Sequence, residues 1–335
     1  MTDATRDEPG PAPPGLLFAR GLDGEGGART IDWEEARGWR QQAPGETLWV
    51  HVDRTVAGIE SWLSTGLAIA EPTVALLVSN DTRPRAFREG DALVTVLRGI
   101  NLNPGSEPED MVAMQIWADG NRLVSLRRRR LQTPLDVMAL LDAGRGPRTT
   151  GDLLAELVEQ LVAKMNGSIV AMNGRIDELE DAGEDADAGA LLDEIAAIRR
   201  KCLALKRFMS PQHEALQQIC RNPPPWLSEA NCRDVHETIE RLRRYLDDLD
   251  VSKESAIVLQ DDLNNRPANQ TNKTMYMLSM VAAIFLPLTF ITGLLGINVG
   301  GMPGVQSHDA FWITVGLLAV LLVIQIAIFR RIKWL

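Results

Sequence analysis

One helical stripe of side chains near the C-terminus of this 335-residue chain is best placed to handle a cation. Steps of three and four residues lead from carboxylates through amides into an uncharged segment that ends at Gly296, Ile297 and Asn298. Residues three and four apart share one face of a helix, so the spacing predicts a continuous stripe. The positions that we expect to line an ion path are Asp261, Asn272, Met275, Leu278, Ala282, Leu286, Thr289 and Gly293.

The stripe offers a cation carboxylates at one end, hydroxyls and backbone carbonyls along the uncharged segment, and the Asn298 amide at the other end. This ligand set suits a hydrated cation better than one stripped of its water. Apart from Tyr276 at its edge, the segment holds no ionisable side chain, so no proton relay is predicted inside it. Proton coupling would have to use groups outside it, such as Asp261 on one side or His308 and Asp309 on the other.

Two long runs without Asp, Glu, Lys or Arg surround this path, from Met275 to Leu295 and from Ala310 to Phe329. As a helix the first run would be roughly 32 Å long, enough to cross the hydrocarbon core of a bilayer. The short connection between the runs predicts a helical hairpin in a membrane. Interface aromatics fit at Tyr276 and Trp312.

The basic residues that flank the runs predict the orientation of the hairpin. Lys273 precedes the first run, Arg330, Arg331 and Lys333 follow the second, and the connecting loop has no Lys or Arg. By the positive-inside rule, both termini are expected in the cytoplasm and the loop outside. Two spans are too few to enclose an aqueous path, so the hairpin either assembles in several copies or serves as a passive anchor.

The bulk composition limits the partners of the remaining chain. The net charge is −10, and the residues from Met275 onward sum to +2, which leaves −12 on the first 274 residues. So acidic a domain does not suit nucleic acid, but it attracts cations. The three cysteines, Cys202, Cys220 and Cys232, form no CxxC pair, which suits a reducing compartment.

Short β-rich runs in the first half of the chain predict a mixed α/β domain, a small sheet flanked by helices. The strand-like runs are 47–53, the two pieces of 85–97, 111–118 and 122–126, and short helices are expected over 34–41 and 61–68. Two motifs in this domain could suggest a binding site, but a plainer interpretation of each is preferred. The glycines of 21–27 lack the strand and helix that a phosphate loop requires. The arginines of 127–130 are read as a solvated strand end that pairs with acidic neighbours.

From Pro134 the pattern is helical. An amphipathic helix is expected over 151–181 and a second over 191–220 with a kink or restart at Ser210-Pro211. A third begins near Ser228, and Pro267 should kink rather than end it. The predicted segments are a disordered tail 1–15, a cytoplasmic α/β domain 16–150, an antiparallel helical pair 151–226, a stalk helix 227–274, a first transmembrane helix 275–298, a periplasmic loop 299–309, a second transmembrane helix 310–329 and a basic cytoplasmic tail 330–335.

The residues Phe285-Leu286-Pro287-Leu288-Thr289 and Thr292 to Asn298, with the following loop, make the chain resemble the CorA superfamily of divalent metal-ion transporters. Within it the chain is most similar to the ZntB branch, which is associated with zinc. The resemblance implies an α+β membrane protein of the bacterial inner membrane, a funnel-shaped homopentamer with an N-terminal cytoplasmic α/β/α domain, a long stalk helix and a C-terminal two-helix hairpin. It also implies no cofactor other than the transported cation, and as partners only other copies of the chain, the lipid bilayer and divalent metal ions.

Two departures from the magnesium-transporting pattern favour zinc. Ile297 stands in the middle of the Gly-Met-Asn signature, and the loop Gly301-Met302-Pro303-Gly304 lacks the acidic residue that often follows Met-Pro. Magnesium, cobalt or nickel moving through the same pore is the alternative.

A membrane-anchored metal sensor is a further possibility. In that case the hairpin would be a passive anchor and the N-terminal domain would do the binding. Separately, Cys232 and His236, four apart on a helix, are a possible pair of soft-metal ligands, but no further ligand accompanies them. An enzyme is not predicted, because the chain has only four scattered histidines and no nucleophile motif.

Overall fold

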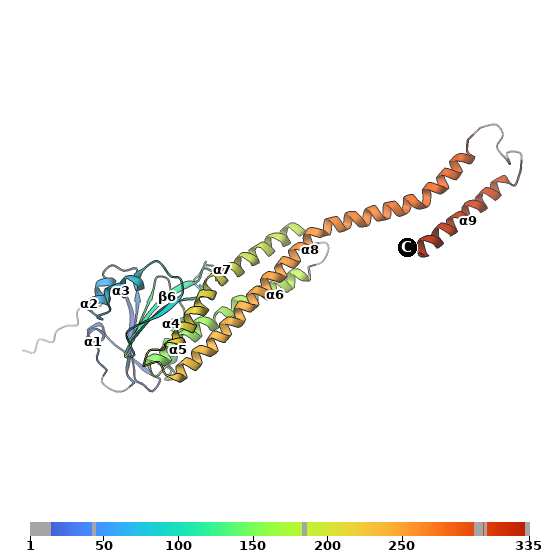
Figure 1. The fold of residues 1–335 in the computed structure, drawn as a ribbon. Coiled ribbons are helices and arrows are strands. Elements are labelled where there is room, and N and C mark those ends of the chain that lie inside the picture. The colour runs from blue at the N-terminus through green and yellow to red at the C-terminus, as the bar shows by residue number, and fades with distance from the viewer. Residues whose placement is uncertain (1–14, 42–44, 183–185, 298–303, 305–306, 332–335) are drawn as a thin grey trace, which may run out of the picture. The chain divides into compact units, whose positions relative to one another are not determined.

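The computed structural model describes residues 15–41, 45–182, 186–297, 304 and 307–331. The chain divides into two compact units, Met1–Gln260 and Asp261–Leu335. The first unit contains a seven-stranded sheet and the helices that cover it, and the second contains the apolar hairpin (Figure 1).

The sheet has the strand order β2-β1-β3-β7-β6-β5-β4. Strands β3 and β7 pair in parallel, with Val50 opposite Val124, and every other neighbouring pair is antiparallel. The strands are β1 (Leu16–Leu22), β2 (Ala28–Thr30), β3 (Thr47–Asp53), β4 (Arg85–Glu89), β5 (Ala92–Gly99), β6 (Val112–Ala118) and β7 (Arg122–Arg127).

The central strands are buried on both faces, which explains why they are nearly continuous apolar runs in the sequence. Three short helices cover one face: α1 (Trp33–Arg37), α2 (Ile59–Thr65) and α3 (Glu71–Val78) (Figure 1). Trp62, Leu63 and Leu77 of these helices share a hydrophobic core with alternate residues of the strands, including Val50 and Val94.

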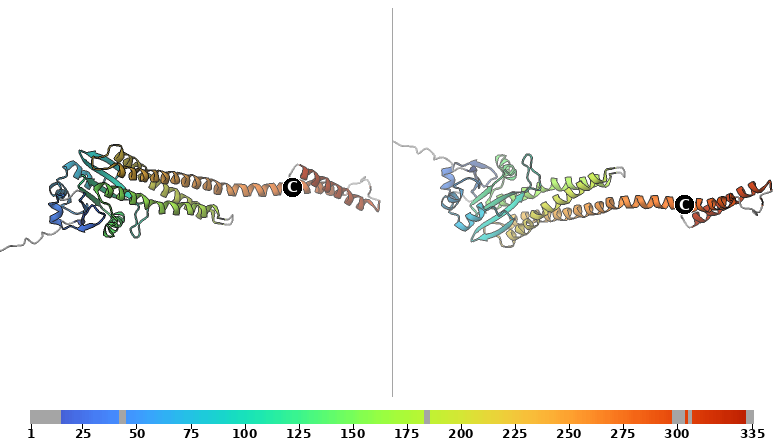
Figure 2. Two further views of the ribbon diagram at one scale, coloured as in Figure 1. Left: turned by 90° about the horizontal axis from the view of Figure 1, so that it is seen from below. Right: turned by 90° about the horizontal axis from the view of Figure 1, so that it is seen from above.

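Longer helices follow the sheet in the chain, and Figures 1 and 2 show α4, α5 and α7 on the side of the sheet away from α1 and α3. Helix α5 begins at a capping box in which Thr149 accepts from the Asp152 amide and Asp152 accepts from the Thr149 amide. Helix α5 packs against β5, and α7 packs against β4 and β5. The bounds are α4 (Thr133–Asp142), α5 (Thr150–Ala163), α6 (Met165–Glu180) and α7 (Ala188–Arg221).

The structure corrects the predicted helical pair in two places. The helix expected over 151–181 is two helices, α5 and α6, with a break at Lys164, whose ammonium group pairs with Asp136 of α4. Helix α7 continues through Pro211 without a restart. Met209, Gln212 and Leu216 around it are fully buried, and this burial outweighs the cost of about 3 kcal/mol that a proline has inside a helix. The strand β1, which precedes the glycines of 21–27, and the helix α3 were not predicted.

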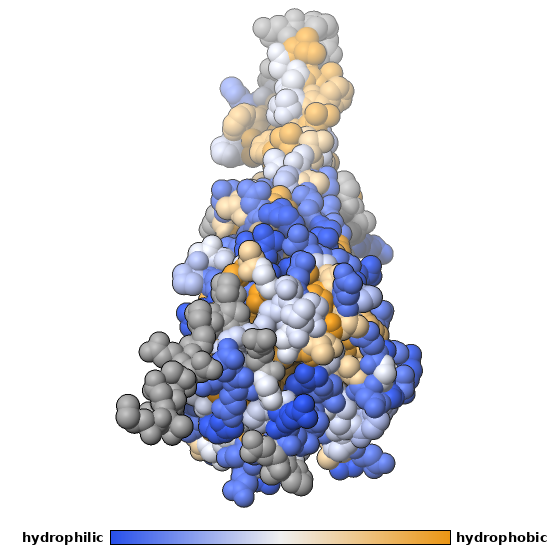
Figure 3. Space-filling view, turned by 90° about the vertical axis from the view of Figure 1, so that its left-hand side faces the viewer, coloured by the Kyte–Doolittle hydropathy of each residue, from blue (hydrophilic) through white to orange (hydrophobic). Residues whose placement is uncertain are grey.

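Helix α8 (Glu229–Leu295) starts in the first unit, passes through Pro267 and Pro287, and ends in the second unit. Helix α9 (Ala310–Arg331) follows. Both are long and apolar enough to cross a membrane. In each helix, no residue of the most apolar stretch is buried. Figure 3 shows hydrophobic side chains gathered on these helices, whereas the visible surface of the first unit is mainly hydrophilic. The predicted two-helix hairpin is confirmed by these elements, while the tail 1–14 and most of the loop lie outside the described residues.

Candidate ion path

The stripe predicted from the sequence lies on the exposed surface of α8. Met275 is 60% exposed, Leu278 65% and Leu286 71%. The smaller residues of the stripe are exposed as well: Asn272, Ala282, Thr289 and Gly293. The structure therefore leaves these side chains free for water, lipid or another copy of the chain.

The opposite side of α8 carries the contact with α9. At 3.6 residues per turn, the half-buried residues of this segment fall across the helix from the stripe. The Gln325 side-chain amide of α9 lies 3.5 Å from the Ala283 carbonyl oxygen and donates to it. The hairpin thus turns one face of α8 inward and presents the stripe outward. The half-buried residues of α8 are Met280, Ala283, Ile284, Pro287, Leu288 and Ile291.

Hydroxyl groups beside the stripe are oriented by the helix itself. Ser279 Oγ donates to the Met275 carbonyl at 2.8 Å, and Thr292 Oγ1 donates to the Thr289 carbonyl at 3.0 Å. Each hydroxyl proton is used inside the helix, so the hydroxyl oxygen keeps its lone pairs for a donor such as the water shell of a cation. This chemistry fits a hydrated ion.

The two ends of the stripe differ in what the structure describes. Asp261 is exposed, and within the described residues no ion pair to it is found, whereas its neighbour Asp262 lies 3.5 Å from Arg266. At the other end, the Gly296 amide donates to the Thr292 carbonyl at 3.0 Å and closes the helix. Ile297 is exposed, and Asn298 lies outside the described residues.

The predicted groups outside the path lie where α9 begins. His308 and Asp309 are exposed. The Asp309 carbonyl accepts from the Ile313 amide at 3.1 Å, which makes Asp309 the first backbone acceptor of α9. His308 is therefore exposed, two residues before the first residue of α9.

Cys232 and His236 lie one turn apart on α8, and the His236 Nδ1 atom is 2.7 Å from the Cys232 carbonyl oxygen. Among the described residues, no cluster of three or more His, Cys, Asp or Glu side chains could hold a metal ion. The nearby thiol of Cys220 is half-buried, and this partial burial, followed by the neighbouring Cys232, raises its pKa to about 12. The structure thus adds no third ligand to this pair and keeps the adjacent Cys220 thiol protonated at neutral pH.

Gln325 is a residue of this region that the sequence reading did not single out. It is half-buried, it makes the polar contact between α8 and α9, and its Oε1 atom is buried with no partner among the described residues. A lone amide in an otherwise apolar span was the available signal, because polar side chains in such spans bind a neighbouring helix.

Comparisons with known proteins agree over nearly the whole chain. The family model described as "CorA-like Mg2+ transporter protein" matches residues 44–331. The chain is 36% identical to the divalent cation transporter CmaX of Pseudomonas aeruginosa, over 96% of this chain and 97% of the relative. It is 32% identical to the zinc transport protein ZntB of Pectobacterium atrosepticum, over 96% of each chain.

Solved structures show the same arrangement. The structure of full-length CmaX superposes with a TM-score of 0.74 and 35% sequence identity. The match includes 98% of this chain and 100% of the CmaX chain. The complete CorA magnesium transporter of Methanocaldococcus jannaschii covers 95% of this chain, with a TM-score of 0.67 and 17% identity, which shows the shared fold. An N-terminal α/β domain, a long helix and two C-terminal apolar helices are therefore a common architecture.

Proposed function

This chain belongs to the family of CorA-like Mg2+ transporter proteins, and from that premise we propose that it carries hydrated zinc through a homopentameric pore lined by α8. As a member of that family it is a divalent cation transporter, not an enzyme, and it needs no cofactor. The ion, the number of subunits and the lining of the pore are the proposed parts.

The observation that carries the pore proposal is the pair of opposite faces on α8. A passive anchor needs an apolar face toward α9 and apolar side chains elsewhere. Here the face away from α9 also collects small and polar residues, among them Ala282, Thr289 and Gly293. Small residues allow helices to approach closely and leave room for water, so several copies of this face would form a narrow, wettable channel.

Two features support zinc as the ion. The relatives named ZntB are described as zinc transport proteins. Ile297 and the loop with Gly304 follow the zinc-associated pattern rather than the magnesium pattern. The charge of −12 on the first 274 residues favours cations in general, so it supports transport without selecting the metal.

The proposed setting is the bacterial inner membrane with both termini in the cytoplasm. The basic residues Arg330 and Arg331 end α9, and Lys273 precedes the apolar part of α8. Basic residues stay on the cytoplasmic side, so the acidic sheet unit would face the cytoplasm and His308 the outside.

Metal uptake into liposomes that hold the purified protein tests the proposal. Zinc, magnesium, cobalt and nickel should be compared at equal concentration, with and without a pH gradient, and zinc is expected to enter fastest. Faster uptake of magnesium, cobalt or nickel would leave the pore proposal standing and assign a different ion to it. No uptake of any of them would favour the membrane-anchored sensor.

The Asn298→Ala variant tests the pore mouth. We expect normal assembly and loss of most of the transport, because the ring of amides that holds hydrated cations would be gone. Asn269→Ala is the matched control, since Asn269 is an exposed amide of α8 that lies well away from the stripe. Native mass measurement in mild detergent should show five subunits for all three proteins, and only monomers and dimers would contradict the pore.

A further inference from the structure

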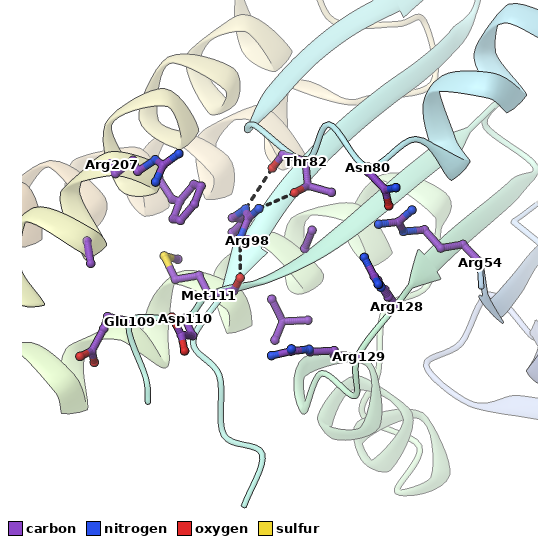
Figure 4. A pocket seen from close by; sticks show the side chains of 14 residues that line it. Arg54, Asn80, Thr82, Arg98, Glu109, Asp110, Met111, Arg128, Arg129 and Arg207 are labelled. Atoms are coloured by element: carbon purple, nitrogen blue, oxygen red, sulfur yellow. Dashed lines mark hydrogen bonds between the residues drawn. The ribbon is translucent and has the colours of Figure 1, made fainter. Parts of the chain in front are cut away.

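A pocket in the first unit, far along the chain from the candidate ion path, gathers five arginines. Its volume is about 550 Å³, and Figure 4 shows these side chains around it. They come from the ends of β3 and β7, from β5 and from α7, so the fold rather than the sequence brings them together. The arginines are Arg54, Arg98, Arg128, Arg129 and Arg207.

These arginines form no salt bridge in the described part of the chain, although the nearby Asp53 partly offsets the fall in the pKa of Arg54. No carboxylate of the described residues forms an ion pair with any of the five. Of the two acidic side chains at the pocket, Glu109 already lies 3.6 Å from Lys201. The predicted pairing of the arginines of 127–130 with acidic neighbours therefore holds only in part: Asp53 attracts Arg127, whereas no carboxylate forms a salt bridge with Arg128 or Arg129 in the described residues. The pocket gathers positive charge within an acidic unit.

Arg98 is held in place by neutral groups alone. Its guanidinium donates to the Thr82 carbonyl at 3.0 Å, to the Thr82 hydroxyl and to the Met111 carbonyl at 2.5 Å (Figure 4). It also lies 3.8 Å from the centre of the Phe208 ring. These contacts fix the position of the charge without neutralising it, as a preformed anion site requires.

Arg54 adds a donor that is not satisfied. Its Nη1 atom donates to the Val78 carbonyl at 2.6 Å, but its Nε atom is buried with no partner in the described residues. Burial lowers the pKa of Arg54 and the nearby Arg128 lowers it further, and burial and then Arg207 act in the same way on Arg98. The arginines repel one another, and an anion between them would relieve that repulsion.

We propose that this pocket binds a small molecule that carries two or more phosphoryl groups. The planar guanidinium fork matches phosphate oxygens bidentately. A single phosphate monoester carries about −1.5 to −2 charges at neutral pH, and each further phosphoryl group of a chain adds to this, so a chain of two or three offsets much of the charge of the five arginines. The volume is within the usual range for a small-molecule site.

Isothermal titration of the purified full-length protein with inorganic pyrophosphate, after removal of divalent metals with a chelator, tests this site. The Arg128→Gln/Arg129→Gln variant removes two exposed pocket arginines, and Arg130→Gln is the matched control from the same run, outside the pocket. We expect the wild type and the control to bind alike and the double variant to bind at least tenfold more weakly. ATP serves as a second probe: binding tighter than that of pyrophosphate assigns the site to nucleotides, and equal binding assigns it to the phosphate chain alone.

Three results would overturn the proposal. One is the absence of pyrophosphate and ATP binding at millimolar concentration, and another is equal affinity of the double variant and the wild type. The third is pyrophosphate binding that emerges only in the full-length Asp3→Asn/Asp7→Asn/Glu8→Gln variant. That result would assign the pocket to the acidic N-terminal segment of the chain itself.

Discussion

The sheet unit and the hairpin use equally apolar residues with opposite results. Leu97 of β5 is completely buried between elements of its own chain, whereas Leu286 of α8 is 71% exposed. None of the most apolar stretch of α8 or α9 is buried. An apolar sequence therefore does not specify its packing partner: the apolar residues of the sheet pack within one chain, whereas those of the hairpin stay exposed in the single chain.

The largest expected effect separates these two leucines. Leu97→Ala should destabilise the sheet unit by about 2–5 kcal/mol, because it removes buried methyl groups and leaves a cavity. Leu286→Ala is the same chemical change at an exposed site and should leave the unfolding of the sheet unit unchanged. Thermal unfolding of both purified variants beside the wild type measures this, and equal losses would contradict the division of roles between the two regions.

The second largest expected effect is a pH dependence of stability that arises from a histidine in the sheet. His51 of β3 is 2% exposed, and its Nδ1 atom lies 2.8 Å from Ser125 Oγ. Burial, helped by the charge of Arg127, lowers its pKa from 6.5 to about 3, while Ser125 and Asp53 act weakly in the other direction. The folded protein therefore keeps His51 neutral where the unfolded chain binds a proton.

The sign of the pH effect follows from that difference. The stability that depends on neutral His51 is complete above pH 6.5 and is lost as the pH falls from there toward 3. The loss is about 1.4 kcal/mol per pH unit, or about 2 kcal/mol at pH 5. His51→Gln should flatten the decline of the unfolding midpoint between pH 6.5 and 5, and His236→Gln, at an exposed position, should not. Parallel declines in all three proteins would exclude His51 as the cause.

The sequence predicted some parts of the molecule well because the responsible residues are neighbours in the chain. The hairpin and the stripe of α8 follow from composition and from spacings of three and four, both of which are local. The α5–α6 break at Lys164 was not predictable, because it involves Asp136 of another helix. The arginine pocket was missed for the same reason: Arg54, Arg98 and Arg207 are distant in the sequence and meet only in the fold.

The smallest expected effect concerns the exposed histidine of the hairpin, His308, which is the counterpart of His51. Apart from Tyr276 at its edge, no ionisable side chain lies in the apolar part of either helix, so any dependence of zinc uptake on external pH is expected to use groups outside it. Histidine is the side chain that ordinarily titrates near pH 6.5, so His308→Ala should flatten the uptake profile between about pH 5.5 and 7.5. Flux itself should persist, because Asn298 rather than His308 forms the proposed mouth.

Zinc uptake into liposomes, measured against external pH for the wild type and the His308→Ala variant, decides whether His308 sets this pH dependence. Overlapping curves would show that His308 is only a polar loop residue, and the contrast between a histidine that governs stability and one that governs transport would be lost.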